Sequence, residues 1–217
     1  MRAATVGKGS RSSDNSPFTN AADYFEAVGA TDAPLILTDA DYTRHFAAIQ
    51  LGNPDSATSL PNLLLALDYI DEANDLRDGE GRSPLLVGDS LMAAAMANAD
   101  YIREVWGHPQ QWEGLAENIA AGFSGPPFSD NSPFVGWYDD ERVIWNDALE
   151  SGDYPGLEDM SIYQVYVAYP ALYYAVGHYL NLMDQSNVVT GFGVYTSEYP
   201  YYAQEFTGSA GRFTSGN

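Results

Sequence analysis

The end of the chain constrains the fold most, because a helical phrase with a histidine is followed there by two strand-like runs. The phrase covers residues 175–184 and contains His178. Two short runs rich in aromatic and β-branched residues follow at 191–195 and 201–206, and a turn-like Ser-Glu-Tyr-Pro segment separates them. Such runs on either side of turn residues predict a β-hairpin. We therefore expect a short helix or helix end that presents a histidine, followed by a hairpin.

Apolar residues at helical spacing predict three longer helices upstream. The first opens at Leu60 with proline next and stops near residue 78, and the second follows Asp89, where its alanines allow a neighbour to approach closely. The third carries Trp137 and Ala148 but also places acidic residues among its aromatics, which a plain core stripe does not do. The segment 115–122 between the second and third helices is predicted to be extended.

The first part of the chain is predicted to form an addition to this core. Residues 1–16 are rich in Gly, Ser and Asn, which predicts a disordered arm. Residues 17–59 predict a helical extension, with one helix from Pro17 to about residue 29 and another that begins at residues 38–41. The polar residues 208–217 predict a loose tail.

The charge balance excludes several classes of function. The chain has 9 Lys and Arg against 30 Asp and Glu, a formal net charge of −21, which repels nucleic acid and anionic membranes. It has no cysteine, so it has no disulfide and no thiolate zinc site. No apolar run is long enough to span a membrane, and the first residues contain no apolar segment typical of a secretory signal.

Four phrases in order resemble the CAP superfamily, also called the SCP domain, which includes cysteine-rich secretory proteins, insect antigen 5 and plant pathogenesis-related proteins. The phrases are residues 116–120, 136–141 and 177–179 and the closing hairpin, preceded by matches in the first two helices at Leu76-Arg77, Gly81, Pro84-Leu85, Leu91 and Ala95. The ending at 181–184 and the lack of cysteine are similar to the cysteine-free bacterial branch. The resemblance covers residues 60–207. It implies an α+β fold, a three-layer α-β-α sandwich of the CAP type, with the N-terminal helical extension outside it.

The resemblance also implies a cleft in which two histidines and two acids meet. His108 matches the first histidine, Glu117 the first acid and His178 the second histidine. The second acid of the family stands three residues after the helix tryptophan, which is Asp140 here, with Glu141 next to it. Either residue could complete the tetrad. Asn118, Tyr138 and Tyr179 are the expected ligand-binding residues.

Two imidazoles and two carboxylates are ligand types that suit zinc or another divalent cation, with His108 and His178 as the metal ligands. Two histidines alone make an incomplete site, so weak metal binding is expected. A purely structural role also stays open, in which His178 is a hydrogen-bonded histidine among tyrosines. The tyrosines themselves fit a core and cleft wall better than a carbohydrate platform.

Two functions follow from these residues. The first is a secreted or cell-wall-associated binding module whose acidic cleft holds a small molecule, lipid, peptide or cell-wall ligand, with or without a metal. The second is a metal-assisted hydrolase, such as a peptidase, that uses Glu117 or the helix acid as its base. The family is mostly secreted, which implies an extracellular location. A fold of this kind does not by itself establish an activity.

Overall fold

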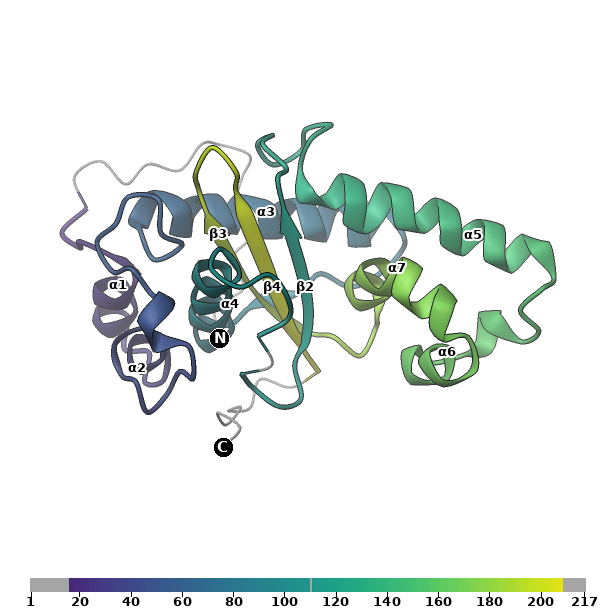
Figure 1. Cartoon of the computed structure of the whole chain (residues 1–217), viewed down its shortest axis with the longest axis horizontal. Helices are drawn as coiled ribbons and strands as arrows, with labels where there is room; N and C mark the ends of the chain where they lie inside the picture. Colours follow the sequence, from purple (N-terminus) through teal and green to yellow (C-terminus); the bar gives the residue numbers. More distant parts are fainter. Residues whose placement is uncertain (1–15, 110, 209–217) are drawn as a thin grey trace.

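The computed structural model describes residues 16–109 and 111–208, which form helices around one sheet (Figure 1). The elements are α1 (Ala21–Ala27), α2 (Ala33–Thr38), η1 (Phe46–Ala48), α3 (Leu60–Gly79), β1 (Leu86–Val87), α4 (Asp89–Ile102), β2 (Ala116–Ala121), η2 (Val135–Asp140), α5 (Glu141–Ser151), η3 (Leu157–Asp159), α6 (Ile162–Ala168), α7 (Pro170–Met183), β3 (Val189–Tyr195) and β4 (Tyr201–Thr207). The predicted arm and most of the predicted tail lie outside the described residues. None of the described helices is long and apolar enough to cross a membrane.

The four strands form one mixed sheet in the order β1-β3-β4-β2. Strands β3 and β4 form the predicted antiparallel hairpin, β2 pairs with the other edge of β4, and the short β1 runs parallel to β3. The register places Gly191, Glu205 and Glu117 directly opposite one another on three adjacent strands. Because side chains alternate between the faces of a sheet, these three residues form one row on one face.

Helix α4 covers the face that carries this row. A Cβ atom at Gly191 would lie 2.0 Å from the carbonyl carbon of Leu91, and one at Gly193 would lie 2.2 Å from the carbonyl oxygen of Ala95. Both strand positions must therefore be glycine for the backbone of α4 to rest on β3. The alanines of α4 serve the same close approach, as the sequence predicted.

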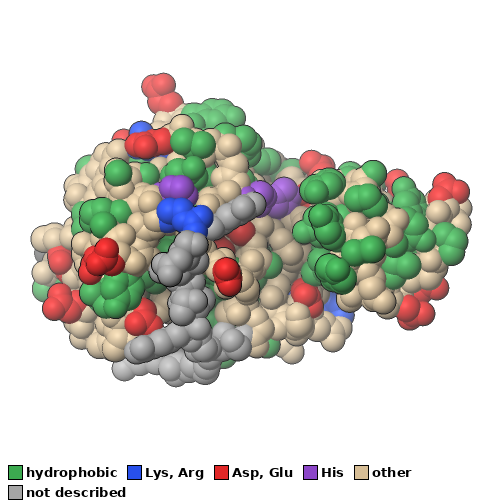
Figure 2. Space-filling view, turned by 60° about the horizontal axis from the view of Figure 1, so that its bottom comes forward, with side chains coloured by type: hydrophobic (Ala, Val, Ile, Leu, Met, Phe, Trp, Pro, Cys, Tyr) green, Lys and Arg blue, Asp and Glu red, His purple; other side chains and the backbone are tan. Residues whose placement is uncertain are grey.

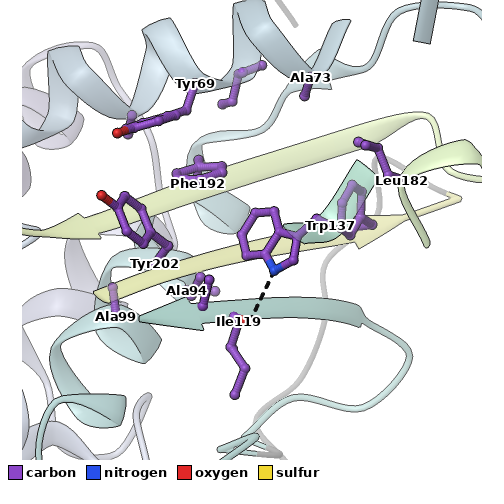
Figure 3. Packing of buried hydrophobic residues seen from close by; sticks show 14 of the residues in the cluster. Tyr69, Ala73, Ala94, Ala99, Ile119, Trp137, Leu182, Phe192 and Tyr202 are labelled. Carbon is purple, nitrogen blue, oxygen red and sulfur yellow. Dashed lines mark hydrogen bonds between the residues drawn. The ribbon is translucent and has the colours of Figure 1, made fainter. Parts of the chain in front are cut away.

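The opposite face of the sheet packs against α3 and the segment before α5 (Figure 3). Phe192 of β3 stacks on Tyr69 of α3 at 5.1 Å between ring centroids, and Trp137 lies 5.9 Å from Phe192. The indole Nε1 of Trp137 donates to the carbonyl of Ile119 in β2 at 3.2 Å. With α4 on one side and α3 on the other, the chain has the expected α+β, three-layer α-β-α architecture.

The N-terminal extension is helical and covers the outer side of α4 (Figure 1). The carboxylate of Asp100 in α4 holds the last part of the extension. It accepts hydrogen bonds from the backbone N–H of Gln50 and Ala57 and from the hydroxyl of Ser56, at 2.7–3.1 Å. Burial raises the pKa of Asp100 to about 6. Because the sheet lies on one side and the extension on the other, α4 is buried almost all round.

The helices of the extension differ in detail from the predicted ones. The first begins at Ala21 rather than Pro17, because the side chain of Asn20 caps it by accepting from two backbone N–H groups. The predicted helix starting at residues 38–41 is wrong. Thr38 ends α2, and the carboxylate of Asp39 accepts from the backbone N–H of Asp41 at 2.9 Å, which forms a turn instead.

Candidate functional site

The first histidine–acid pair joins the segment after α4 to strand β2. The Nδ1 atom of His108 lies 2.6 Å from Oε1 of Glu117, whose side chain points toward α4. The ring is half exposed, whereas the carboxylate is 12% exposed. The hydrogen bond with Glu117 raises the pKa of His108, and partial burial of the ring opposes this. The carboxylate thus fixes the ring and favours its protonated form.

The second pair depends on a break within α7. Val176 leaves the helical conformation, with φ of −137° and ψ of 15°, so a second helical segment starts just before His178. The carboxylate of Glu141 caps this segment: Oε2 accepts from the backbone N–H of Tyr179 at 2.8 Å, and Oε1 lies 2.5 Å from Nδ1 of His178. An acid at a helix start satisfies an unpaired N–H and interacts favourably with the helix dipole.

Between the two predicted candidates for the second acid, the structure brings Glu141 to His178 and leaves Asp140 exposed. The cause is the π-helical turn η2, which contains one extra residue per turn compared with the spacing expected from the sequence. It places Glu141, four residues after Trp137, on the side that faces α7. The indole ring of Trp137 also stacks on the His178 ring at 5.9 Å between centroids.

Both histidines line one open cavity of about 1270 Å³ that also includes Glu117. His178 therefore lines the same cavity as His108 and Glu117, which are far from it in the sequence. Glu141 does not line this cavity, but together with His178 it lines a second hollow of about 650 Å³. Histidine side chains lie next to a large apolar patch in Figure 2, over the part of the molecule formed by α6 and α7.

Tyrosines from α6 and α7 form one wall of the larger cavity. The wall consists of Tyr163, Tyr166, Tyr173 and Tyr174. Three of the rings contact one another edge to face, at 5.1 Å for Tyr166 and Tyr173 and 5.5 Å for Tyr173 and Tyr174. Tyr163 and Tyr174 are nevertheless about three quarters exposed. The sequence suggested core or cleft wall for these tyrosines, and four of them are cleft wall.

The three residues expected to contact a ligand are buried and do not line this cavity. Asn118 donates to the carbonyl of His178 at 3.0 Å, so it holds α7 against β2. Tyr138 donates to the carboxylate of Glu80 at 2.7 Å and packs against Tyr179 at 5.9 Å. These side chains position the segment that carries His178, and we assign them no contact with a ligand.

Three polar residues at the site were not found from the sequence: Asn98, Gln111 and Glu205. The amide Nδ2 of Asn98 in α4 donates to Glu117 and to Glu205, at 2.6 Å in each case. Gln111 donates to Oδ1 of Asn98 at 2.6 Å and accepts from the backbone N–H of His45, which links the extension to the site. The alternation of β4 was a usable signal, since it places Glu205 on the same face as Ala203 within a buried strand.

The described residues contain no group of three or more His, Asp and Glu side chains arranged to hold a metal ion. The two carboxylates of the tetrad instead bond to Nδ1 of the histidines. Metal-binding histidines often use a carboxylate in this way to orient the ring. Each carboxylate of the tetrad therefore orients a histidine, and the described residues form no site with three or four protein ligands for a metal ion.

Comparison with protein-family models gave a match over the part of the chain that carries the site. A model of the cysteine-rich secretory protein (CAP) family matches residues 70–208, more than half of the chain. Comparisons with curated proteins and with solved structures gave no match. The match covers all four strands and both histidine–acid pairs, and it leaves the helices α1 and α2 outside. The chain belongs to the cysteine-rich secretory protein (CAP) family.

Proposed function

We propose that this protein is a secreted binding module that takes a ligand in the open cavity between His108 and the tyrosine wall. The observation that carries the proposal is the convergence of both carboxylate-oriented histidines with four tyrosines at that cavity. Concave sites with a few oriented polar groups and aromatic walls are typical of ligand binding. The extracellular location rests on the family, whose members are described as secretory.

The arrangement of the acids favours binding over catalysis. The carboxylate of Glu141 holds His178 and the backbone N–H of Tyr179, and that of Glu117 holds His108 and Asn98. Each acid therefore uses both oxygens to orient a neighbour, so we assign the two carboxylates a positioning role rather than the role of a general base.

A metal-assisted hydrolase is the second candidate, and the orientation of the imidazoles supports it. A carboxylate at Nδ1 leaves Nε2 as the metal-binding atom, and no hydrogen bond to Nε2 is present for His108 or His178 in the described part of the chain. A divalent cation such as zinc would be held by these two atoms, where it would supply an activated water or polarise a carbonyl.

Calorimetric titration of zinc into chelator-treated protein, together with turnover of a broad peptide library, separates the two candidates. His108→Ala and His178→Ala are the test variants. His45→Ala is the control, because His45 stacks on Tyr101 at 3.7 Å and does not line the cavity. We expect zinc to bind weakly or not at all, with no turnover. Zinc-dependent turnover that is lost in both test variants and kept in the control would overturn the binding module in favour of the hydrolase.

A ligand screen tests the binding module directly. Saturation-transfer NMR with peptides, oligosaccharides and fatty acids should find a binder whose signal is lost in Tyr174→Ala, because this exposed ring lines the cavity. The signal should persist in Tyr42→Ala, which removes an exposed tyrosine of the extension. If every binder responds equally to both variants, the cavity is not the binding site.

A further inference from the structure

The larger cavity is acidic, and His108 and His178 are the basic groups among its described lining residues. Its lining includes four acidic residues, and none of the described lining residues is Lys or Arg. The acidic residues are Glu113, Glu117, Asp184 and Glu205. An anionic ligand would be repelled here, whereas a cationic one would be attracted.

The most deeply buried acid of the lining is Glu205, which the His and Glu tetrad does not include. It is 1% exposed and lies directly opposite Glu117 on the neighbouring strand. A single amide nitrogen, Nδ2 of Asn98, donates to both carboxyl groups at 2.6 Å. Burial and the nearby charge of Glu117 raise the pKa of Glu205 well above its usual value. The raised pKa favours the neutral form of Glu205, so the negative charge of the lining comes mainly from Glu113, Glu117 and Asp184.

The tyrosine wall is an independent feature that suits the same kind of ligand. Tyr163 is 73% and Tyr174 is 75% exposed, and the ring of Tyr166 lies 6.4 Å from that of Tyr174. These large aromatic surfaces bury little area within the described part of the chain. The faces of tyrosine rings attract guanidinium and ammonium groups, and arginine stacks on them especially well.

We propose that the cavity binds an extended, arginine-rich peptide segment of a partner protein, with its guanidinium groups on the tyrosine wall and near the acidic residues of the lining. The proposal rests on the proposed function and names its ligand class. A neutral oligosaccharide would use the tyrosines but would make no use of the charges of Glu113 and Asp184 in the lining. An arginine peptide uses both features, which is the charge complementarity that selects it.

Fluorescence anisotropy tests this with a labelled peptide of alternating glycine and arginine. Peptides that replace arginine with serine or glutamate are the negative probes, and a neutral chito-oligosaccharide is the competing class. The protein carries a net charge of −21, so the measurement is made near physiological salt, about 150 mM, where the screening length is about 8 Å. At this salt concentration, attraction between the peptide and distant charges of the protein is screened, so the remaining binding comes from direct contact.

Paired variants locate the binding. Tyr163→Ala, Tyr174→Ala and Glu113→Gln change exposed lining residues, and Tyr42→Ala and Glu150→Gln make the same changes at exposed positions outside the cavity. We expect each lining variant to weaken the arginine peptide by about fivefold, the effect of one exposed cation–π or charge contact. The two control variants should stay within about twofold of the parent.

Each contrary result has a distinct meaning. Equal losses in lining and control variants would show attraction by net charge alone and would overturn the proposal. Binding of the oligosaccharide that depends on Tyr174, with no binding of the arginine peptide, would overturn it but leave the binding module intact. If no probe class binds in a way that depends on the lining, both the ligand class and the binding module are wrong.

Discussion

Replacement of Glu141 by alanine tests the reasoning about the second histidine–acid pair. The change removes the acceptor of two hydrogen bonds, one from the His178 ring and one from the backbone N–H of Tyr179. Because Val176 interrupts the helix just before, the N–H of Tyr179 lies at a helix start and depends on this carboxylate. Asp140→Ala is the matched control, since Asp140 is the neighbouring acid and is exposed.

The expected loss of unfolding free energy in Glu141→Ala follows from these two hydrogen bonds. Loss of a charge-assisted hydrogen bond costs about 1.5–3 kcal/mol, and a buried backbone N–H without a partner costs about 1–3 kcal/mol. The His178 side chain is 33% exposed, so water replaces part of the first loss. We therefore expect Glu141→Ala to lower the free energy of unfolding by about 3 kcal/mol and Asp140→Ala by less than about 0.5 kcal/mol.

Urea unfolding followed by tryptophan fluorescence measures both values. Trp137 stacks on the His178 ring, so its emission reports on this region directly. Glu141→Gln should give an intermediate loss, because its amide can still accept from the ring but presents a donor to the N–H of Tyr179. If Asp140→Ala were as destabilising as Glu141→Ala, the π-helical turn would not position the acids as described.

Three further predictions follow. Glu117→Gln should lower the pKa of His108 toward 6.5 in an NMR titration, and an unchanged pKa would contradict the pairing. Because the pKa is raised in the folded state, His108 contributes fully to stability below pH 6.5, and this contribution is lost as pH rises through the folded-state pKa. The pKa of Asp100 is raised from 3.8 to about 6, so the folded state holds this proton more tightly than the unfolded state does. The free energy of unfolding should therefore fall by about 3 kcal/mol for this group alone as pH rises from 3.8 to 6. Asp100→Asn should remove that decrease in urea unfolding at several pH values. Gly193→Ala should prevent folding as judged by circular dichroism, because its Cβ would meet the backbone of α4, whereas Gly79→Ala has open space and should leave the spectrum unchanged.

Local patterns in the sequence predicted most of the fold. The hairpin and the three longer helices each show a periodicity that their own residues determine, and Leu60 begins a helix as expected. The second helix was expected to follow Asp89, but Asp89 is its first residue and Gly88 is at the N-cap. The helix predicted from residues 38–41 failed because the side chain of Asp39 forms a turn with the backbone. Periodicity reports which face is apolar, and it does not report such local competition.

The candidate site was harder to predict in detail. His108, Glu117 and His178 were found through the family phrases, and the structure brings them to one cavity. The choice between Asp140 and Glu141 depended on a π-helical turn, which has no signal in the spacing of the residues.

Asn98 and Glu205, which were not found from the sequence, belong to separate elements. Asn98 lies on α4 and Glu205 on β4, and they meet only because two strand glycines allow α4 to rest on the sheet. A contact of this kind depends on the packing of a helix on a sheet. The sequence pattern of either element alone does not contain it.

The tautomers of the three imidazoles, measured by long-range ¹H–¹⁵N NMR, test the central claim most directly. In both pairs a carboxylate lies at Nδ1, so the neutral rings of His108 and His178 should carry their proton on Nδ1 and leave Nε2 free. The chain has only three histidines, so the signals can be assigned with single variants. Protonation at Nε2 in the neutral form of either ring would contradict the orientation on which the candidate site depends.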